Sequence, residues 1–139
     1  MADLTVALTW TGEALRFRGG KVGGPEVVID SDGVAGPSPT VSLALALAGC
    51  MAVDVLDIAQ KMRVSVTGLR VVVESDRRAE PPRRFTAMRQ KFVVAGAPAD
   101  AEPKLQRAID LSREKYCSVW HSMRQDIEFA ITFKVTAGV

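Results

Sequence analysis

An apolar run of eleven residues, from Leu43 to Val53, most constrains how this chain can fold. A helix that spans a bilayer needs about 20 apolar residues, so a run of this length predicts a core helix rather than a membrane helix. Ser38 can cap such a helix, and Pro39 suits its first position, where the missing N–H costs nothing. We predict a helix over residues 39–63 that is about 37 Å long. Because its first half is apolar on all sides, we expect it to be buried at the centre of the fold.

Alternating apolar residues predict strands on both sides of this helix. Three precede it as an opening meander, and two follow it as a long hairpin around Pro81 and Pro82. Pro103 opens a second helix through Lys115, and a last strand follows. The order is therefore βββ-α-ββ-α-β, an α+β domain that covers residues 1–139 without a linker. The predicted strands are residues 3–10, 15–18, 27–30, 64–74, 85–94 and 127–135.

The composition is that of a globular protein without a strong charge bias. Of 139 residues, 47% are hydrophobic and 24% are charged, and 18 basic against 16 acidic side chains give a net charge of +2. This balance disfavours a disordered chain and a nucleic-acid or membrane-surface protein. The first residues lack the pattern of an export signal, so we expect a cytoplasmic protein. Two cysteines and one histidine, without CxxC spacing, cannot assemble a four-ligand zinc site.

Six basic residues near the predicted hairpin make the best case for a nucleic-acid partner. Asp76 and Glu80 interleave with them, however, and no aromatic stacking platform accompanies them. A turn at the two prolines explains them as a solvated hairpin tip, so we expect no nucleic-acid partner. The six are Arg77, Arg78, Arg83, Arg84, Arg89 and Lys91.

Cys50 lies where the apolar stripe of the predicted helix becomes polar. Steps of three and four residues place it on one face with Leu47 and Asp54. Such a boundary suits a thiol that is shielded yet reachable, although a free cysteine is more often a small core residue. Asp54 would raise the thiol pKa, so a reactive thiolate needs an external cation. Arg16 or Arg18, which share one face of the second strand, are candidates; a solvated strand face is the alternative.

Cys117 lies in a second segment that can carry chemistry. If this segment is helical, Arg113 and His121 flank the thiol one turn away on either side, a neighbourhood that would lower its pKa. One histidine without an orienting Asn or Asp is weak evidence for a Cys-His nucleophile. Tyr116 and Trp120 are either packing residues or aromatic walls of an apolar substrate pocket.

Two motifs resemble those of the OsmC/Ohr family, the osmotically inducible and organic hydroperoxide resistance proteins. The first is Pro-Ser-Pro at 37–39 followed by residues 43–54, the second is residues 108–119, and each contains one cysteine. Residues 71–78, 81–85 and 92–96 are similar to the OsmC-like branch, so the resemblance covers essentially the whole chain. It implies an intertwined homodimer in which two antiparallel-type sheets surround long central helices.

The resemblance also implies a thiol-dependent peroxidase. The Cys50 thiolate would attack the O–O bond of an organic hydroperoxide, and Cys117 would convert the resulting sulfenic acid into a disulfide. A dithiol reductant of the lipoyl type would reopen that disulfide, and no metal, haem or flavin is required. From the resemblance and the residues together we predict Cys50, Cys117 and Arg18 as catalytic residues and Arg16, Tyr116 and Trp120 as substrate-binding residues.

The start of the long helix departs from the family pattern. Family peroxidases carry a glutamate just after its first proline, and that carboxylate holds an arginine against the reactive thiolate; here Thr40 and Val41 follow Pro39. The departure supports an alternative, an apolar-ligand-binding or redox-sensing protein with little peroxidase turnover. The pKa of the Cys50 thiol separates the two, since a value near ~8.5 favours binding and a value well below ~7 favours the peroxidase.

Overall fold

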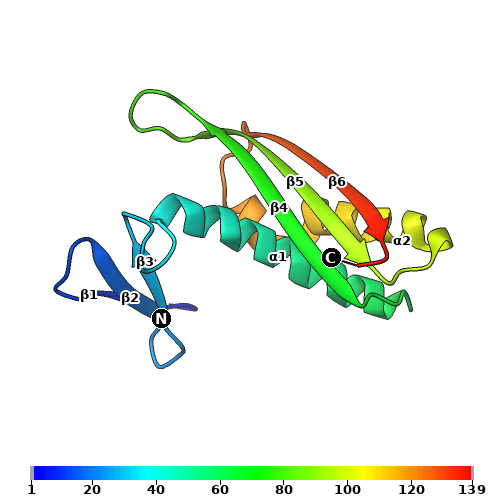
Figure 1. Cartoon of the computed structure of the whole chain (residues 1–139), viewed down its shortest axis with the longest axis horizontal. Coiled ribbons are helices and arrows are strands. Elements are labelled where there is room, and N and C mark those ends of the chain that lie inside the picture. Colours follow the sequence, from blue (N-terminus) through cyan, green and yellow to red (C-terminus); the bar gives the residue numbers. More distant parts are fainter. Residues whose placement is uncertain (1, 139) are drawn as a thin grey trace. The chain divides into compact units, whose positions relative to one another are not determined.

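The computed structural model describes residues 2–138, which divide into two compact units between Leu45 and Ala46. This boundary falls inside α1, the helix Pro39–Lys61, and each unit is described by itself. The chain is a mixed α+β protein whose strands form two three-stranded sheets (Figure 1). The single domain over residues 1–139 stays a prediction.

Three strands form the predicted antiparallel meander in the N-terminal unit. They are β1 (Val6–Trp10), β2 (Arg16–Lys21) and β3 (Val27–Asp30). Arg16 opposes Asp30 across β2 and β3, and its Nε donates to the Asp30 carboxylate at 3.2 Å. The buried Asp30 also accepts three backbone N–H groups of the following loop. This carboxylate therefore ties the loop before α1 to the sheet.

Helix α1 begins as predicted and ends two residues early. The Ser38 hydroxyl accepts a backbone N–H of the first turn at 3.3 Å, and Pro39 is the first helical residue. At the other end Arg63 has a positive φ of 60°. A residue in this left-handed conformation closes a helix, so α1 ends at Lys61 instead of the predicted residue 63.

The burial of α1 differs from the prediction of a helix enclosed on all sides. The chain's own residues cover one face, formed by Leu47, Ala48, Met51, Val55 and Ala59. On other faces Leu45 and Val53 are 58% and 68% exposed, because within residues 2–138 no second layer covers them. By length and composition α1 could cross a membrane, with a mean hydropathy of 2.0 in its most apolar window, but core helices of water-soluble proteins share these properties.

The C-terminal unit holds the second sheet, in the order β4-β5-β6 (Figure 1). β4 (Gly68–Arg77) and β5 (Phe85–Ala95) form the predicted long hairpin. β6 (Glu128–Thr136) pairs with β5 in parallel, so the prediction of antiparallel-type sheets is wrong for this pair. The helical connection after β5 carries the chain back to the end where β5 began, so the two strands run in the same direction.

A broken helical segment replaces the single helix predicted over residues 103–115. Figure 1 shows α2 and the C-terminal part of α1 along one side of the sheet. The Gln90 amide of β5 contacts the Met51 sulfur of α1 at 3.2 Å, and both side chains are buried. The segment consists of η1 (Ala99–Ala101), α2 (Glu102–Leu111), the π-helical turn η2 (Ser112–Tyr116) and α3 (Ser118–His121).

Candidate functional site

The two cysteines, distant in sequence, meet in the C-terminal unit. Cys50 lies near the middle of α1 and is partly exposed, and its Sγ is 3.8 Å from Oγ of Ser118. Cys117 directly precedes Ser118, and hydrogen bonding between the two thiols affects the pKa of each. Folding thus places both sulfur atoms in one site.

Cys117 is fully buried at the junction of η2 and α3. Its backbone is extended, with φ −72° and ψ 96°, so it interrupts the helical segment. Its N–H donates to the Ser112 carbonyl at 2.8 Å, which closes the π-helical turn. Its Sγ accepts the N–H of Trp120 at 3.4 Å, and the cysteine therefore caps α3 with its own side chain.

The pKa of the Cys50 thiol is lowered from its ordinary value of 9.0. Burial is the largest single influence and raises this pKa, but hydrogen bonds from the Val119 N–H, the Cys117 thiol and the Ser118 hydroxyl together outweigh it. The charge of Asp54 raises the pKa, as the sequence indicated. The sequence predicted that an arginine would activate Cys50, whereas neutral hydrogen-bond donors at residues 117–119 lower the Cys50 pKa here.

The pKa of the Cys117 thiol is raised to about 11. Burial is the main cause; one backbone N–H opposes it, and the Cys50 sulfur and the Asp54 carboxylate reinforce it. The prediction that Arg113 and His121 would lower this pKa is wrong. Because Cys117 is not helical, the expected spacing is lost, and Nε2 of His121 instead lies 2.9 Å from the Arg113 carbonyl oxygen.

These opposite shifts give the two thiols different chemistry. The thiolate is the nucleophilic form of cysteine, and Cys50 forms it more readily and is the more accessible sulfur. Cys117 stays protonated at neutral pH and donates toward Cys50. The arrangement suits a first attack by Cys50 followed by a reaction between the two sulfur atoms.

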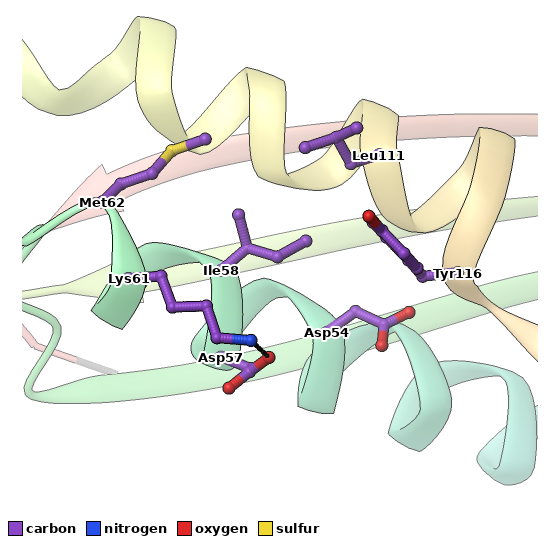
Figure 2. A pocket seen from close by; sticks show the side chains of 7 residues that line it. All are labelled: Asp54, Asp57, Ile58, Lys61, Met62, Leu111 and Tyr116. Atoms are coloured by element: carbon purple, nitrogen blue, oxygen red, sulfur yellow. Dashed lines mark hydrogen bonds and ion pairs between the residues drawn. The ribbon is translucent and has the colours of Figure 1, made fainter.

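A pocket of about 550 Å³ adjoins both thiol-bearing segments (Figure 2). Asp54 lies one helical turn after Cys50, and Tyr116 directly precedes Cys117. Figure 2 shows side chains from α1 facing Leu111 of α2 and Tyr116 of η2 across the pocket. Three apolar, one aromatic and three charged residues line it: Ile58, Met62, Leu111, Tyr116, Asp54, Asp57 and Lys61, of which Lys61 Nζ pairs with Asp57 at 2.9 Å.

The two predicted substrate-binding aromatics lie in different surroundings. Tyr116 is half exposed and lines the pocket. Trp120 is 5% exposed, and its ring centroid is 4.4 Å from that of Phe129 in β6. The indole is therefore part of the core, and it is the backbone N–H of Trp120 that donates to the Cys117 sulfur. A role of either aromatic in substrate binding stays a prediction.

Arg16 and Arg18 both belong to β2 in the N-terminal unit. The Arg16 guanidinium is held by Asp30 at 3.2 Å and by Glu13 at 3.3 Å. Arg18 is exposed and opposes Val28 of β3. Their proposed actions on the thiols and on substrate stay predictions.

The basic residues of the hairpin are partly engaged with neighbours in the chain. Arg89 pairs with Asp76 at 3.0 Å and with Glu74 at 3.7 Å, and the Arg77 guanidinium lies 5.9 Å from the Phe85 ring centroid. Such exposed pairs fit a solvated hairpin tip, and the absence of a nucleic-acid partner stays a prediction. Within residues 2–138, no group of three or more His, Cys, Asp or Glu side chains could hold a metal ion.

Sequence analysis missed three residues that act on the thiols: Ser112, Ser118 and Val119. Each acts through the π-helical turn or the helical turn after it, and apolar periodicity does not predict where a regular helix changes to a π turn. The one available signal was the serine that directly follows Cys117, and that signal is too common to be specific.

Comparisons with known proteins identify relatives of this chain in sequence and in fold. Residues 30–132 match the family model described as OsmC-like protein. Protein YhfA of Escherichia coli strain K12 is 36% identical over 127 residues, which cover 91% of this chain and 94% of YhfA. The crystal structure of a hypothetical protein from Aquifex aeolicus VF5 is 27% identical, with a TM-score of 0.85 over 98% of each chain. An organic hydroperoxide resistance protein OsmC from Legionella pneumophila, 14% identical, shares the fold with a TM-score of 0.65 over 97% of this chain and 98% of that one.

Proposed function

The chain belongs to the OsmC-like family, and from that premise we propose that it is a thiol-dependent peroxidase that reduces organic hydroperoxides to alcohols. One observation carries the proposal: a partly exposed thiol with a lowered pKa, Cys50, is hydrogen-bonded by a buried thiol with a raised pKa, Cys117. The name of the Legionella protein, which shares the fold, supports the choice of substrate.

In the first step the Cys50 thiolate attacks one oxygen of the hydroperoxide. The S–O bond forms as the O–O bond breaks, and the electron pair leaves on the alkoxide, which takes a proton to become the alcohol. Cys50 is thereby oxidised to a sulfenic acid. The donors that lower the thiol pKa, from Cys117, Ser118 and Val119, favour the reactive thiolate before this step.

In the second step Cys117 resolves the sulfenic acid. Its sulfur attacks Sγ of Cys50 and loses its proton, the sulfenic oxygen leaves as water, and an intramolecular disulfide forms. A dithiol of the lipoyl type then reduces this disulfide and becomes a cyclic disulfide, which restores both thiols. In this cycle the two cysteines react, and the turn that carries Cys117 and Ser118 supplies hydrogen bonds to Cys50.

The test is to mix reduced protein with cumene hydroperoxide and to follow the thiol count. We expect both thiols to be consumed and mass spectrometry to identify a Cys50–Cys117 disulfide. Cys50→Ser should abolish peroxide consumption, whereas Cys117→Ser should leave a sulfenic acid that dimedone traps. An unchanged thiol count under excess hydroperoxide would defeat the proposal.

The pocket that Asp54 and Tyr116 help to line favours a second candidate, an apolar-ligand-binding or redox-sensing protein with little turnover. Its volume of about 550 Å³ suits a small ligand, and its wall includes Ile58, Met62 and Leu111. The helix start, where Thr40 and Val41 replace the family's glutamate, points the same way. A lipid that copurifies with the protein and does not react, together with a Cys50 pKa near ~8.5, would select this candidate.

We further propose that the protein works as a homodimer in the cytoplasm, where thiols are kept reduced. In the single chain Val6, Trp10 and Leu45 are 65%, 58% and 58% exposed, and such residues recur along β1 and α1. Soluble monomers rarely expose large apolar patches, so a further surface should cover these elements. A second copy of the chain supplies that surface, and symmetric pairs are the commonest oligomers.

A further inference from the structure

A short polar link connects the two segments that carry the thiols. Ser112 Oγ donates to Oδ2 of Asp54 at 2.7 Å, and the Ser112 carbonyl accepts the Cys117 N–H at 2.8 Å. Asp54 lies on α1 one helical turn beyond Cys50. We propose that Asp54 and Ser112 are positioning residues that hold the Cys117 sulfur in register with Cys50 for disulfide formation. This inference rests on the proposed function of the thiol pair.

Through this link, a single hydrogen bond sets the position of one sulfur atom relative to the other. Asp54 lies four positions after Cys50 in the helix, a rise of about 6 Å along a rigid element. On the other side Ser112 begins the π-helical turn η2 and Cys117 follows its last residue. Movement of the Ser112 backbone relative to α1 therefore moves Cys117 relative to Cys50. The Asp54–Ser112 hydrogen bond restrains that movement.

The π-helical turn needs such an anchor because its own bonding is irregular. Turns of this kind are rare and are frequently found at functional sites. Ser112 is fully buried, so its hydroxyl requires a partner inside the protein, and the Asp54 carboxylate is that partner. Without it the buried hydroxyl is left unpaired and the turn is free to repack, which displaces the thiol that follows it.

Position and charge can be separated at this link. Asp54 also raises the pKa of both thiols through its charge. Ser112→Ala removes the hydrogen bond and keeps the carboxylate. Asp54→Asn removes the charge and keeps an amide oxygen that can accept from Ser112. A positioning role predicts that the first variant impairs pairing of the thiols, and that the second changes their ionisation with little effect on pairing.

The experiment measures the Cys50–Cys117 disulfide at equilibrium with oxidised and reduced dithiothreitol, at pH 7 and with no peroxide present. In this exchange dithiothreitol gives up or takes two electrons and two protons as the protein disulfide closes or opens. We expect Ser112→Ala to lower the equilibrium constant for formation of the protein disulfide by dithiothreitol about tenfold, which corresponds to about 1.4 kcal/mol. Asp54→Asn should remain within about threefold of the wild type, with lower thiol pKa values. Gln106→Ala, which removes an exposed bond to Asp110 on α2, is the matched control.

An unchanged equilibrium constant in folded Ser112→Ala would overturn the proposal, as would an equal loss in Asp54→Asn. If Ser112→Ala does not fold, Asp54→Ala removes the same bond from the α1 side, and its equilibrium constant is compared with that of Asp54→Asn. A purely structural role would lower the melting temperature without changing the equilibrium constant of the folded protein. Because the assay contains no hydroperoxide, loss of the positioning effect and loss of the peroxidase activity are separate results.

Discussion

The opposite pKa shifts of the two cysteines predict which sulfur reacts first with an electrophile. Burial and a neighbouring sulfur raise the pKa of Cys117 to about 11, while donors of one turn lower that of Cys50 below 9.0. At pH 8 only about one Cys117 in a thousand is a thiolate, against more than about one Cys50 in ten. Ionisation alone therefore favours Cys50 by at least about 100-fold.

Intrinsic nucleophilicity reduces this advantage without cancelling it. A thiolate of higher pKa is the better nucleophile. With a Brønsted slope of about 0.45, a pKa difference of about two makes the Cys117 thiolate about eightfold more reactive than the Cys50 thiolate. The net preference for Cys50 is then at least about tenfold. Access increases it further, because Cys117 is fully buried and Cys50 is partly exposed.

The assay is alkylation by iodoacetamide at pH 8 under reducing conditions, followed by peptide mass spectrometry. We expect Cys50 to be modified at least about tenfold faster than Cys117, and the Cys50 rate to follow an ionisation with a midpoint below 9.0. In Cys50→Ser the remaining Cys117 should stay slow, because burial, the main cause of its raised pKa, is still present. Equal rates, or faster modification of Cys117, would refute the assignment of nucleophile and resolving thiol.

Two further predictions concern alkaline stability and assembly. The folded protein holds the Cys117 proton more tightly than the unfolded chain, so the resulting stabilisation is present below pH 9.0 and is lost toward pH 11. Between these pH values the free energy of unfolding, measured by urea denaturation with reductant present, should fall by up to about 3 kcal/mol more in the wild type than in Cys117→Ala. Equal pH dependence of the free energy of unfolding in the two proteins would contradict this prediction. In sedimentation the wild type should have twice the mass of one chain. Val53→Glu, on the exposed side of α1, should reduce this to the mass of one chain, whereas Gln60→Glu, which introduces the same side chain at another exposed position of α1, should not. A wild type that sediments as a single chain would exclude the dimer.

Much of the fold follows from local patterns in the sequence. The Ser38-Pro39 start of α1 and the alternation along β4, β5 and β6 predict these elements, because each reflects interactions within a few residues. The direction of β6 was not predictable in this way. It depends on how the chain returns after α2, and the strand's own alternation is the same for parallel and antiparallel pairing.

The site was predictable in its cysteines and less so in their surroundings. Cys50 was marked by its place at the end of an apolar stripe, a feature that helix periodicity exposes. The environment of Cys117 was predicted only for the case of a helical segment, whereas a π-helical turn followed by an extended residue occurs there. That break removes His121 from the thiol. The Cys117 pKa is raised mainly because the thiol is buried, and local patterns in the sequence do not reveal that burial.

The missing helix-start glutamate has a different meaning once the donors to Cys50 are known. In the family that carboxylate serves an arginine, which stabilises the thiolate by charge. Here the Val119 N–H, the Ser118 hydroxyl and the Cys117 thiol lower the Cys50 pKa without a formal charge, and all three come from the turn that also carries the resolving sulfur. In the proposed peroxidase cycle, activation of Cys50 and closure of the disulfide therefore both depend on the placement of one turn. Because the Asp54–Ser112 bond anchors that turn to α1, a change that displaces it should raise the Cys50 pKa and slow disulfide closure together, whereas loss of a separate cation would affect only the first.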